Sequence, residues 1–95
     1  MDSEKSIEQY LTKKVREAGG KAYKFASPGN QGVPDRIVIF PSGRIVFAEL
    51  KRLDGQLSAL QKNQLEKLRV LKQTTRVIYS KEAVDTLVKE FGGKS

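Results

Sequence analysis

The chain has 95 residues, a length that suits one domain and leaves little room for a second hydrophobic core. Its 18 Lys and Arg residues outnumber its 11 Asp and Glu residues, which gives a net charge of +7 and a pI of about 9.8. This surplus favours binding to a polyanion, either nucleic acid or an acidic membrane surface, although a protein with a merely basic surface would carry the same charge.

The sequence contains neither cysteine nor histidine. Disulfides, thiolate nucleophiles, Cys- or His-ligated metals and Ser-His catalysis are therefore excluded. Any metal must have oxygen ligands, which favours Mg²⁺ or Mn²⁺. The N-terminal segment has no apolar signal region and no run approaches membrane-spanning length, so we expect a cytoplasmic protein with no membrane partner. We also expect no organic cofactor.

The first third of the chain predicts one helix, one strand and a loop. Apolar residues recur at helical spacing over residues 3–18, with Ser3 or Ser6 as the N-cap. Residues 21–26 alternate weakly and predict a short strand. Residues 27–34 are rich in Gly and Pro and predict a loop.

The middle of the chain predicts a β-hairpin. Residues 35–40 and 44–50 are rich in residues that favour strands, and Pro41-Ser42-Gly43 between them is typical of a three-residue turn. Both runs are apolar on both faces, so we expect the hairpin to be covered on each side.

The last third of the chain predicts a helix, a strand and a final helix. Residues 58–73 favour a helix whose apolar stripe consists of Leu60, Leu65, Leu68 and Leu71. Residues 75–80 favour a strand, and Ser80 can cap a helix that ends near Phe91. The tail, residues 92–95, is expected to fray.

The predicted order is α-β-β-β-α-β-α in a single domain over residues 1–95, with its core over about 3–91. We expect an α/β fold in which helices flank both faces of a mixed β-sheet. The last strand follows a helical crossover, so it should run parallel to a core strand.

The hairpin register places two carboxylates together. A three-residue loop pairs Phe40 with Arg44, and the same register sets Asp35 directly opposite Glu49, with Cβ atoms ~4.5–5.5 Å apart. Lys51 lies two residues beyond Glu49 and points to the same face. A two-residue loop would instead put the two carboxylates on opposite faces.

Opposed carboxylates repel unless a cation lies between them. A divalent metal would meet this need, polarise a phosphate and lower the pKa of a water molecule. Lys51 could then orient the attacking water or stabilise the developing charge. Alternatively, Asp35, Glu49 and Lys51 are solvated charges at strand ends.

Four sequence features in this order resemble one nuclease family. The Gly32-Val33-Pro34-Asp35 segment and Glu49-Leu50-Lys51 resemble the bipartite PD-(D/E)xK nuclease signature. Glu8 in the first helix and Leu57-Ser58-Ala59-Leu60-Gln61 at the start of a later helix make the chain most similar to the VRR-NUC (virus-type replication-repair nuclease) branch. The resemblance covers about residues 3–80 and implies a restriction-endonuclease-like core.

The resemblance also implies roles for particular residues. Asp35, Glu49 and the Leu50 carbonyl would bind Mg²⁺ or Mn²⁺, Lys51 would be the catalytic lysine, and Glu8 would support the metal or its water. Gln61 would join the site by hydrogen bonding. For Glu8 and Gln61, an ordinary position on a helix surface is the alternative.

The implied activity is that of a structure-directed DNA endonuclease. Its substrates would be branched DNA, such as Holliday junctions or flaps, in replication, recombination or repair, and the chain would act as a homodimer of the stand-alone form found in phages. A non-catalytic nucleic-acid-binding module on the same scaffold is the alternative. Candidate phosphate contacts, each of which could equally be a solubilising charge, are Lys13, Lys14, Lys24, Arg36 and Arg52.

Overall fold

The computed structural model describes residues 1–93, which contain three helices and four strands. In chain order the elements are helix α1 (Glu4–Glu17), strands β1 (Lys21–Lys24), β2 (Arg36–Ile39) and β3 (Ile45–Leu50), helix α2 (Ala59–Val70), strand β4 (Thr74–Ile78) and helix α3 (Lys81–Phe91). The predicted order is confirmed. Of the tail predicted to fray, residues 92–95, residues 94–95 lie outside the described residues, and Gly92 forms the C-cap of α3.

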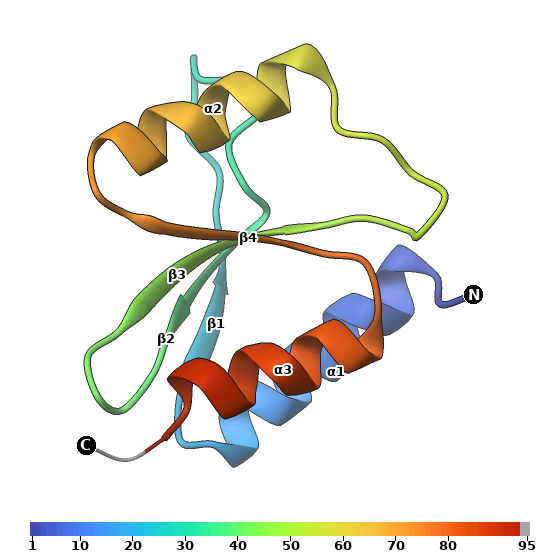
Figure 1. Cartoon of the computed structure of the whole chain (residues 1–95), viewed down its shortest axis with the longest axis vertical. Helices are drawn as coiled ribbons and strands as arrows, with labels where there is room; N and C mark the ends of the chain where they lie inside the picture. Colours follow the sequence, from blue (N-terminus) through green and yellow to red (C-terminus); the bar gives the residue numbers. More distant parts are fainter. Residues whose placement is uncertain (94–95) are drawn as a thin grey trace.

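All four strands form one mixed sheet in the order β1-β2-β3-β4 (Figure 1). Strands β1, β2 and β3 pair antiparallel, and β4 pairs parallel with β3. The parallel pair confirms the expectation drawn from the α2 crossover. Helix α2 lies on one side of the sheet, and α1 and α3 lie on the other, in contact with each other.

The hairpin between β2 and β3 has the predicted three-residue loop. The Phe40 N–H donates to the Arg44 carbonyl at 3.0 Å, and the Gly43 N–H donates to the Phe40 carbonyl at 2.9 Å. Gly43 has φ +88°, a left-handed conformation that glycine adopts without strain. The ladder pairs Arg36 with Ala48, so the two-residue alternative is excluded.

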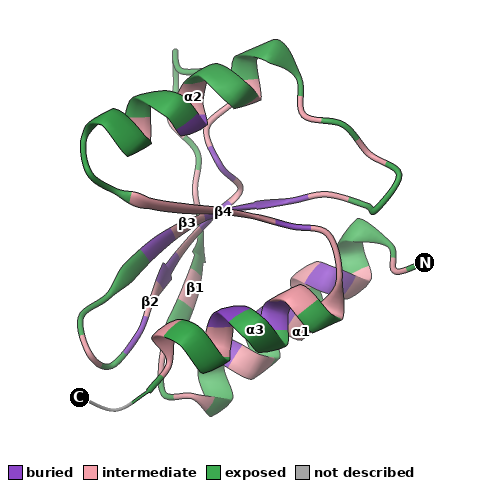
Figure 2. Cartoon of the chain, viewed as in Figure 1, coloured by how far each residue is buried: buried purple, intermediate pink, exposed green. Residues whose placement is uncertain are grey.

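The hydrophobic core fills the space between the sheet and the α1–α3 pair. Figure 2 shows buried positions on the sides of α1 and α3 that face the sheet. From α1 and α3 the core contains Ile7, Leu11, Val15, Val84 and Leu87. From the sheet it contains Val38, Phe40, Val46, Ala48, Leu50 and Ile78. The strand residues are alternate positions of β2 and β3, so the intervening residues point toward the α2 side.

Helix α2 covers less of the sheet than predicted. It packs against β4. Of the predicted leucine stripe, Leu65 is buried, but Leu60 is 51% exposed and Leu71 is 68% exposed. The prediction that the hairpin is covered on each side is therefore only partly correct, and Ile45 remains 42% exposed. None of the helices in residues 1–93 is long and apolar enough to cross a membrane.

Candidate active site

The predicted carboxylate pair forms where β2 begins and β3 ends. Arg36 pairs with Ala48 at this end of the ladder, so Asp35 precedes β2 directly opposite Glu49. Proline fixes the chain before Asp35, and the Asp35 carbonyl accepts a 2.8 Å hydrogen bond from the Phe25 N–H. Glu49 is only 2% exposed. The antiparallel register thus brings Glu49, in β3, to Asp35, the residue immediately before β2.

Each carboxylate accepts a hydrogen bond that fixes one of its oxygens. The Leu50 N–H donates to Asp35 Oδ2 at 2.9 Å. Gln61 Nε2 donates to Glu49 Oε2, also at 2.9 Å. Both bonds are partly buried, so solvent competes with them less than at the surface. The remaining carboxylate oxygens are the candidates for binding a cation.

The pKa of Glu49 is raised from 4.5 to about 7. Burial is the largest cause, followed by the negative charge of Asp35, while the positive charge of Lys51 lowers the pKa. A carboxyl group that resists ionisation beside a second carboxylate is a site where a divalent cation would relieve repulsion. Carboxylates also have the hard oxygen donors that Mg²⁺ and Mn²⁺ prefer, so these residues fit the predicted metals.

Lys51 follows Glu49 by two residues on the same side of the sheet, and its positive charge lowers the pKa of the Glu49 carboxyl group. Its backbone N–H donates to the Ile78 carbonyl at 3.0 Å, so pairing with β4 continues past the end of β3. The side chain is half-buried. Lys51 is therefore anchored by the sheet and can act on a group bound at the two carboxylates.

Gln61 reaches the site from the first turn of α2. Its side chain closes a capping box with Ser58: the Ser58 N–H donates to Gln61 Oε1 at 2.9 Å, and the Gln61 N–H donates to Ser58 Oγ at 3.1 Å. The other end of the same amide contacts Glu49. The structure therefore brings Gln61 together with Asp35, Glu49 and Lys51.

Gly32 connects the loop before Asp35 to the same turn of α2. Its φ is +91°, and a Cβ there would lie 2.6 Å from the Leu60 carbonyl carbon and 2.9 Å from the Gln61 nitrogen. Only glycine allows this approach. The sequence predicted a loop over residues 27–34 and did not predict that it packs on the helix.

Glu8 lies near the site but pairs with a cation. Its Oε1 lies 2.7 Å from Arg36 NH2, and Arg36 is only 5% exposed. Together with Asp35 and Leu50, both residues line a cleft of about 320 Å³ at the end of the sheet. Among residues 1–93, no three acidic side chains form a group that could hold a metal ion. The structure therefore places Glu8 in the cleft without joining it to the Asp35–Glu49 pair.

Arg36, predicted as a phosphate contact on the surface, is buried instead. Arg36 alternates with the core residues Val38 and Phe40, so its side chain points to the α1 face, where Glu8 lies. The alternation of faces along a strand already places Arg36 on the same face as Val38 and Phe40, and the sequence prediction missed this. Within the described chain, the buried Arg36 Nε has no hydrogen-bond partner.

The other candidate phosphate contacts lie on the surface. Lys13 and Lys24 are exposed, and Lys24 lines the cleft. Lys14 pairs with Glu17 at 3.4 Å, and Arg52 pairs with Asp54 at 3.1 Å. Exposed pairs of this kind are weak, so these cations can still meet phosphates.

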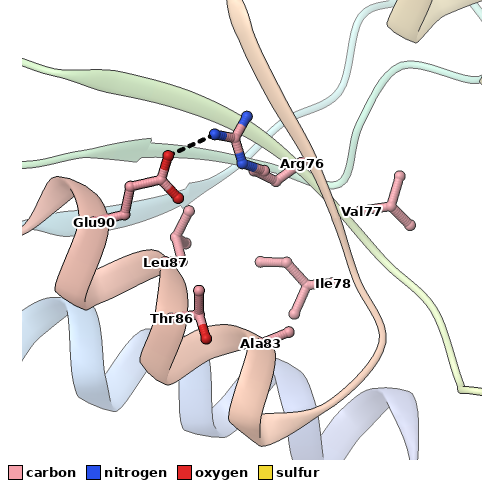
Figure 3. A pocket seen from close by; sticks show the side chains of 7 residues that line it. All are labelled: Arg76, Val77, Ile78, Ala83, Thr86, Leu87 and Glu90. Carbon is pink, nitrogen blue, oxygen red and sulfur yellow. Dashed lines mark hydrogen bonds and ion pairs between the residues drawn. The ribbon is translucent and has the colours of Figure 1, made fainter.

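A second pocket lies between β4 and α3, away from the carboxylate pair (Figure 3). Arg76 NH2 lies 2.8 Å from Glu90 Oε1 across its mouth, and the Arg76 guanidinium lies 5.1 Å from the centre of the Phe91 ring. These contacts hold the end of α3 against the sheet. The residues that line this pocket therefore stabilise the packing of α3 on the sheet and are not part of the candidate site.

Comparisons with known proteins agree with the predicted fold. A solved structure described as "VRR_NUC domain" superposes with a TM-score of 0.85 at 28% sequence identity, over 93% of this chain and 96% of the other. The chain has the fold of a VRR-NUC domain. The predicted family resemblance is therefore confirmed.

A curated relative also carries a nuclease name. "Putative nuclease p44" of Acyrthosiphon pisum secondary endosymbiont phage 1 is 58% identical to this chain over 48 residues, which make up 50% of this chain. The matched region spans 52% of that relative, about half its length. No protein-family model matches the chain.

Proposed function

We propose that the chain is a metal-dependent nuclease that hydrolyses phosphodiester bonds in DNA. The observation that carries this proposal is the carboxylate pair of half-buried Asp35 and buried Glu49 beside Lys51, with the Glu49 pKa raised to about 7. A fold gains nothing from burying two carboxylates together unless a cation completes the site. The VRR-NUC fold and the nuclease name of the phage relative support the same function.

Asp35, Glu49 and the Leu50 carbonyl would hold the Mg²⁺ or Mn²⁺ ion. When bound, the ion would polarise the scissile phosphate and make water more acidic. Mg²⁺ usually keeps several waters, so a site with few protein ligands suits it. Glu8 lines the same cleft, and we assign it a supporting position there.

Lys51 stabilises the charge that develops on the phosphate during attack. Its backbone is held by the sheet and its positive charge acts on Glu49, so the lysine needs little backbone reorganisation when the reaction occurs. Gln61 holds Glu49 in place by donating to Oε2. These two residues therefore act on charge and on position, respectively.

The DNA backbone meets a basic surface. The net charge of +7 draws the chain to phosphates without reading sequence. Lys24 lines the cleft and can contact a phosphate near the site, and Lys13 is exposed on α1, where it can contact the DNA backbone elsewhere. Recognition through backbone phosphates suits a nuclease that selects DNA by shape, and we propose branched DNA as the substrate.

A homodimer would place two sites on two strands of branched DNA. The sheet face that α2 leaves open exposes Tyr23 and Ile45, which are 51% and 42% accessible. Apolar side chains on a small domain favour burial against a second copy. An Ile45→Glu substitution should then yield monomers in solution, as measured by light scattering, while leaving the fold intact.

The test of function is cleavage of labelled DNA with Mn²⁺ or Mg²⁺. A four-way junction, a flap, a plain duplex and a single strand are compared for wild type, Lys51→Ala and the control Lys89→Ala, which removes an exposed lysine from α3. We expect metal-dependent cleavage that falls at least about 10²-fold in Lys51→Ala only. DNA binding without cleavage by the folded wild type would favour the non-catalytic module instead.

A further inference from the structure

The first turn of α2 controls the orientation of the Gln61 amide. A glutamine amide has an acceptor oxygen at one end and a donor NH₂ group at the other. The Ser58 N–H can only donate, so the oxygen of Gln61 must face it, at 2.9 Å. The NH₂ group is thereby directed at Glu49 Oε2, also at 2.9 Å.

The second half of the capping box holds the backbone of this turn. Ser58 Oγ accepts from the Gln61 N–H at 3.1 Å, with Ser58 in extended conformation at φ −71° and ψ 165°. The two bonds are reciprocal, because the side chain of each residue binds the backbone of the other. Without Oγ the first turn frays, and the Gln61 side chain can swing away from Glu49.

We propose that Ser58 is a positioning residue for the carboxylate site: through the capping box it fixes the amide of Gln61 on Glu49. This inference rests on the proposed nuclease function, in which Glu49 holds the metal ion. Groups that orient the ligands of a metal set its affinity, even though they never touch it. Two contacts, Ser58 to Gln61 and Gln61 to Glu49, therefore connect Ser58 to the carboxylate that would hold the ion.

The chain offers a matched control at another helix. Ser80 caps α3 in the same way, and its Oγ accepts from the Ala83 N–H at the same 3.1 Å. Ala83 is apolar and lies away from the carboxylate pair. Ser58→Ala and Ser80→Ala therefore remove the same kind of hydrogen bond, but only the first disturbs the site.

The experiment measures Mn²⁺ binding by titration calorimetry and cleavage kinetics for wild type, Ser58→Ala, Ser80→Ala and Ser58→Thr, which keeps the hydroxyl acceptor. We expect Ser58→Ala to raise the Kd for Mn²⁺ about tenfold and to lower kcat by a similar factor, with the KM for DNA unchanged. Ser80→Ala and Ser58→Thr should stay within about twofold of wild type. Equal effects of the two alanine variants would overturn the proposal, since they would indicate a general loss of helix capping.

A metal-free measurement separates this proposal from the proposed function. In NMR spectra without metal, the Gln61 side-chain NH₂ should exchange slowly in wild type and rapidly in Ser58→Ala. Slow exchange in both would refute the positioning role, even if the protein cuts DNA. Slow exchange in wild type alone, with no Mn²⁺ binding, would refute the nuclease function and keep the positioning of Gln61. If Ser58→Ala does not fold, Ser58→Gly removes the same hydroxyl acceptor at a smaller cost in helix stability, because glycine is a better N-cap than alanine.

Discussion

Replacing Glu49 with glutamine should stabilise the metal-free protein at alkaline pH. The buried Glu49 carboxyl group has its pKa raised from 4.5 to about 7 by burial and by Asp35. Glutamine has the same shape and no charge. Its oxygen can accept from Gln61 Nε2, as Glu49 does now, and its NH₂ group can donate to Asp35.

The sign follows from the protons bound by each state. Between pH 4.5 and 7 the unfolded chain releases the Glu49 proton, while the folded protein retains it. The free energy of unfolding of wild type therefore falls as pH rises through this range and levels off above the folded pKa. A rise from 4.5 to about 7 corresponds to about 3 kcal/mol. The free energy of unfolding of Glu49→Gln should not fall in this way, because glutamine does not ionise.

The assay is urea unfolding in EDTA at pH 4.5 and pH 8.5. Relative to wild type, Glu49→Gln should gain about 3 kcal/mol between the two pH values, whereas the exposed control Glu66→Gln should change by less than about 0.5 kcal/mol. Saturating Mn²⁺ at pH 8.5 should restore wild type by about 2.7 kcal/mol at one hundred times its Kd and leave Glu49→Gln unchanged. The same stability difference at both pH values would show that Asp35 and burial do not perturb Glu49.

Two further substitutions test the packing around the site. Gly32→Ala should lower the free energy of unfolding by about 3 kcal/mol, because it combines left-handed strain with a Cβ 2.6 Å from the Leu60 carbonyl carbon. The control Gly29→Ala, at φ +81° with open space around it in the described chain, should lower it by only about 1 kcal/mol. Both values are measured by thermal unfolding. Similar losses would mean that the loop does not pack on α2. Glu8→Gln should cost about 2 kcal/mol by urea unfolding, since it leaves the guanidinium of Arg36 buried without a counter-charge. A loss below about 0.5 kcal/mol would indicate that the pair is exposed in solution.

The sequence predicted the parts of the fold that depend on local chemistry. The three-residue turn at 41–43 follows from Pro41 and Gly43, and that turn alone sets the register that opposes Asp35 and Glu49. The core positions of α1 follow from helical spacing in the same way. One geometric inference from a turn thus located the central pair of the candidate site.

The features that the sequence did not predict depend on which element packs against a given face of a helix or strand. Spacing in α2 identified a leucine stripe, but it could not show that β4 would cover Leu65 and leave Leu60 and Leu71 exposed. Charge identified Arg36 as a cation without showing that strand parity buries it on Glu8. Periodicity defines a face of an element, and only tertiary packing decides what lies against it.

The contacts of the site also show how segments that lie far apart in the sequence depend on one another. The Gly32 loop packs on the first turn of α2, Gln61 from that turn binds Glu49, and Leu50, next to Glu49, donates its N–H to Asp35 at the end of the same loop. These contacts form a closed ring. Breaking one member loosens both neighbours, so the start of α2 and the carboxylate pair should form and be lost together. Only the two ends of the linker from β3 to α2 belong to the ring. A change in the length of the linker should therefore disturb the site less than a substitution of the residues at its ends.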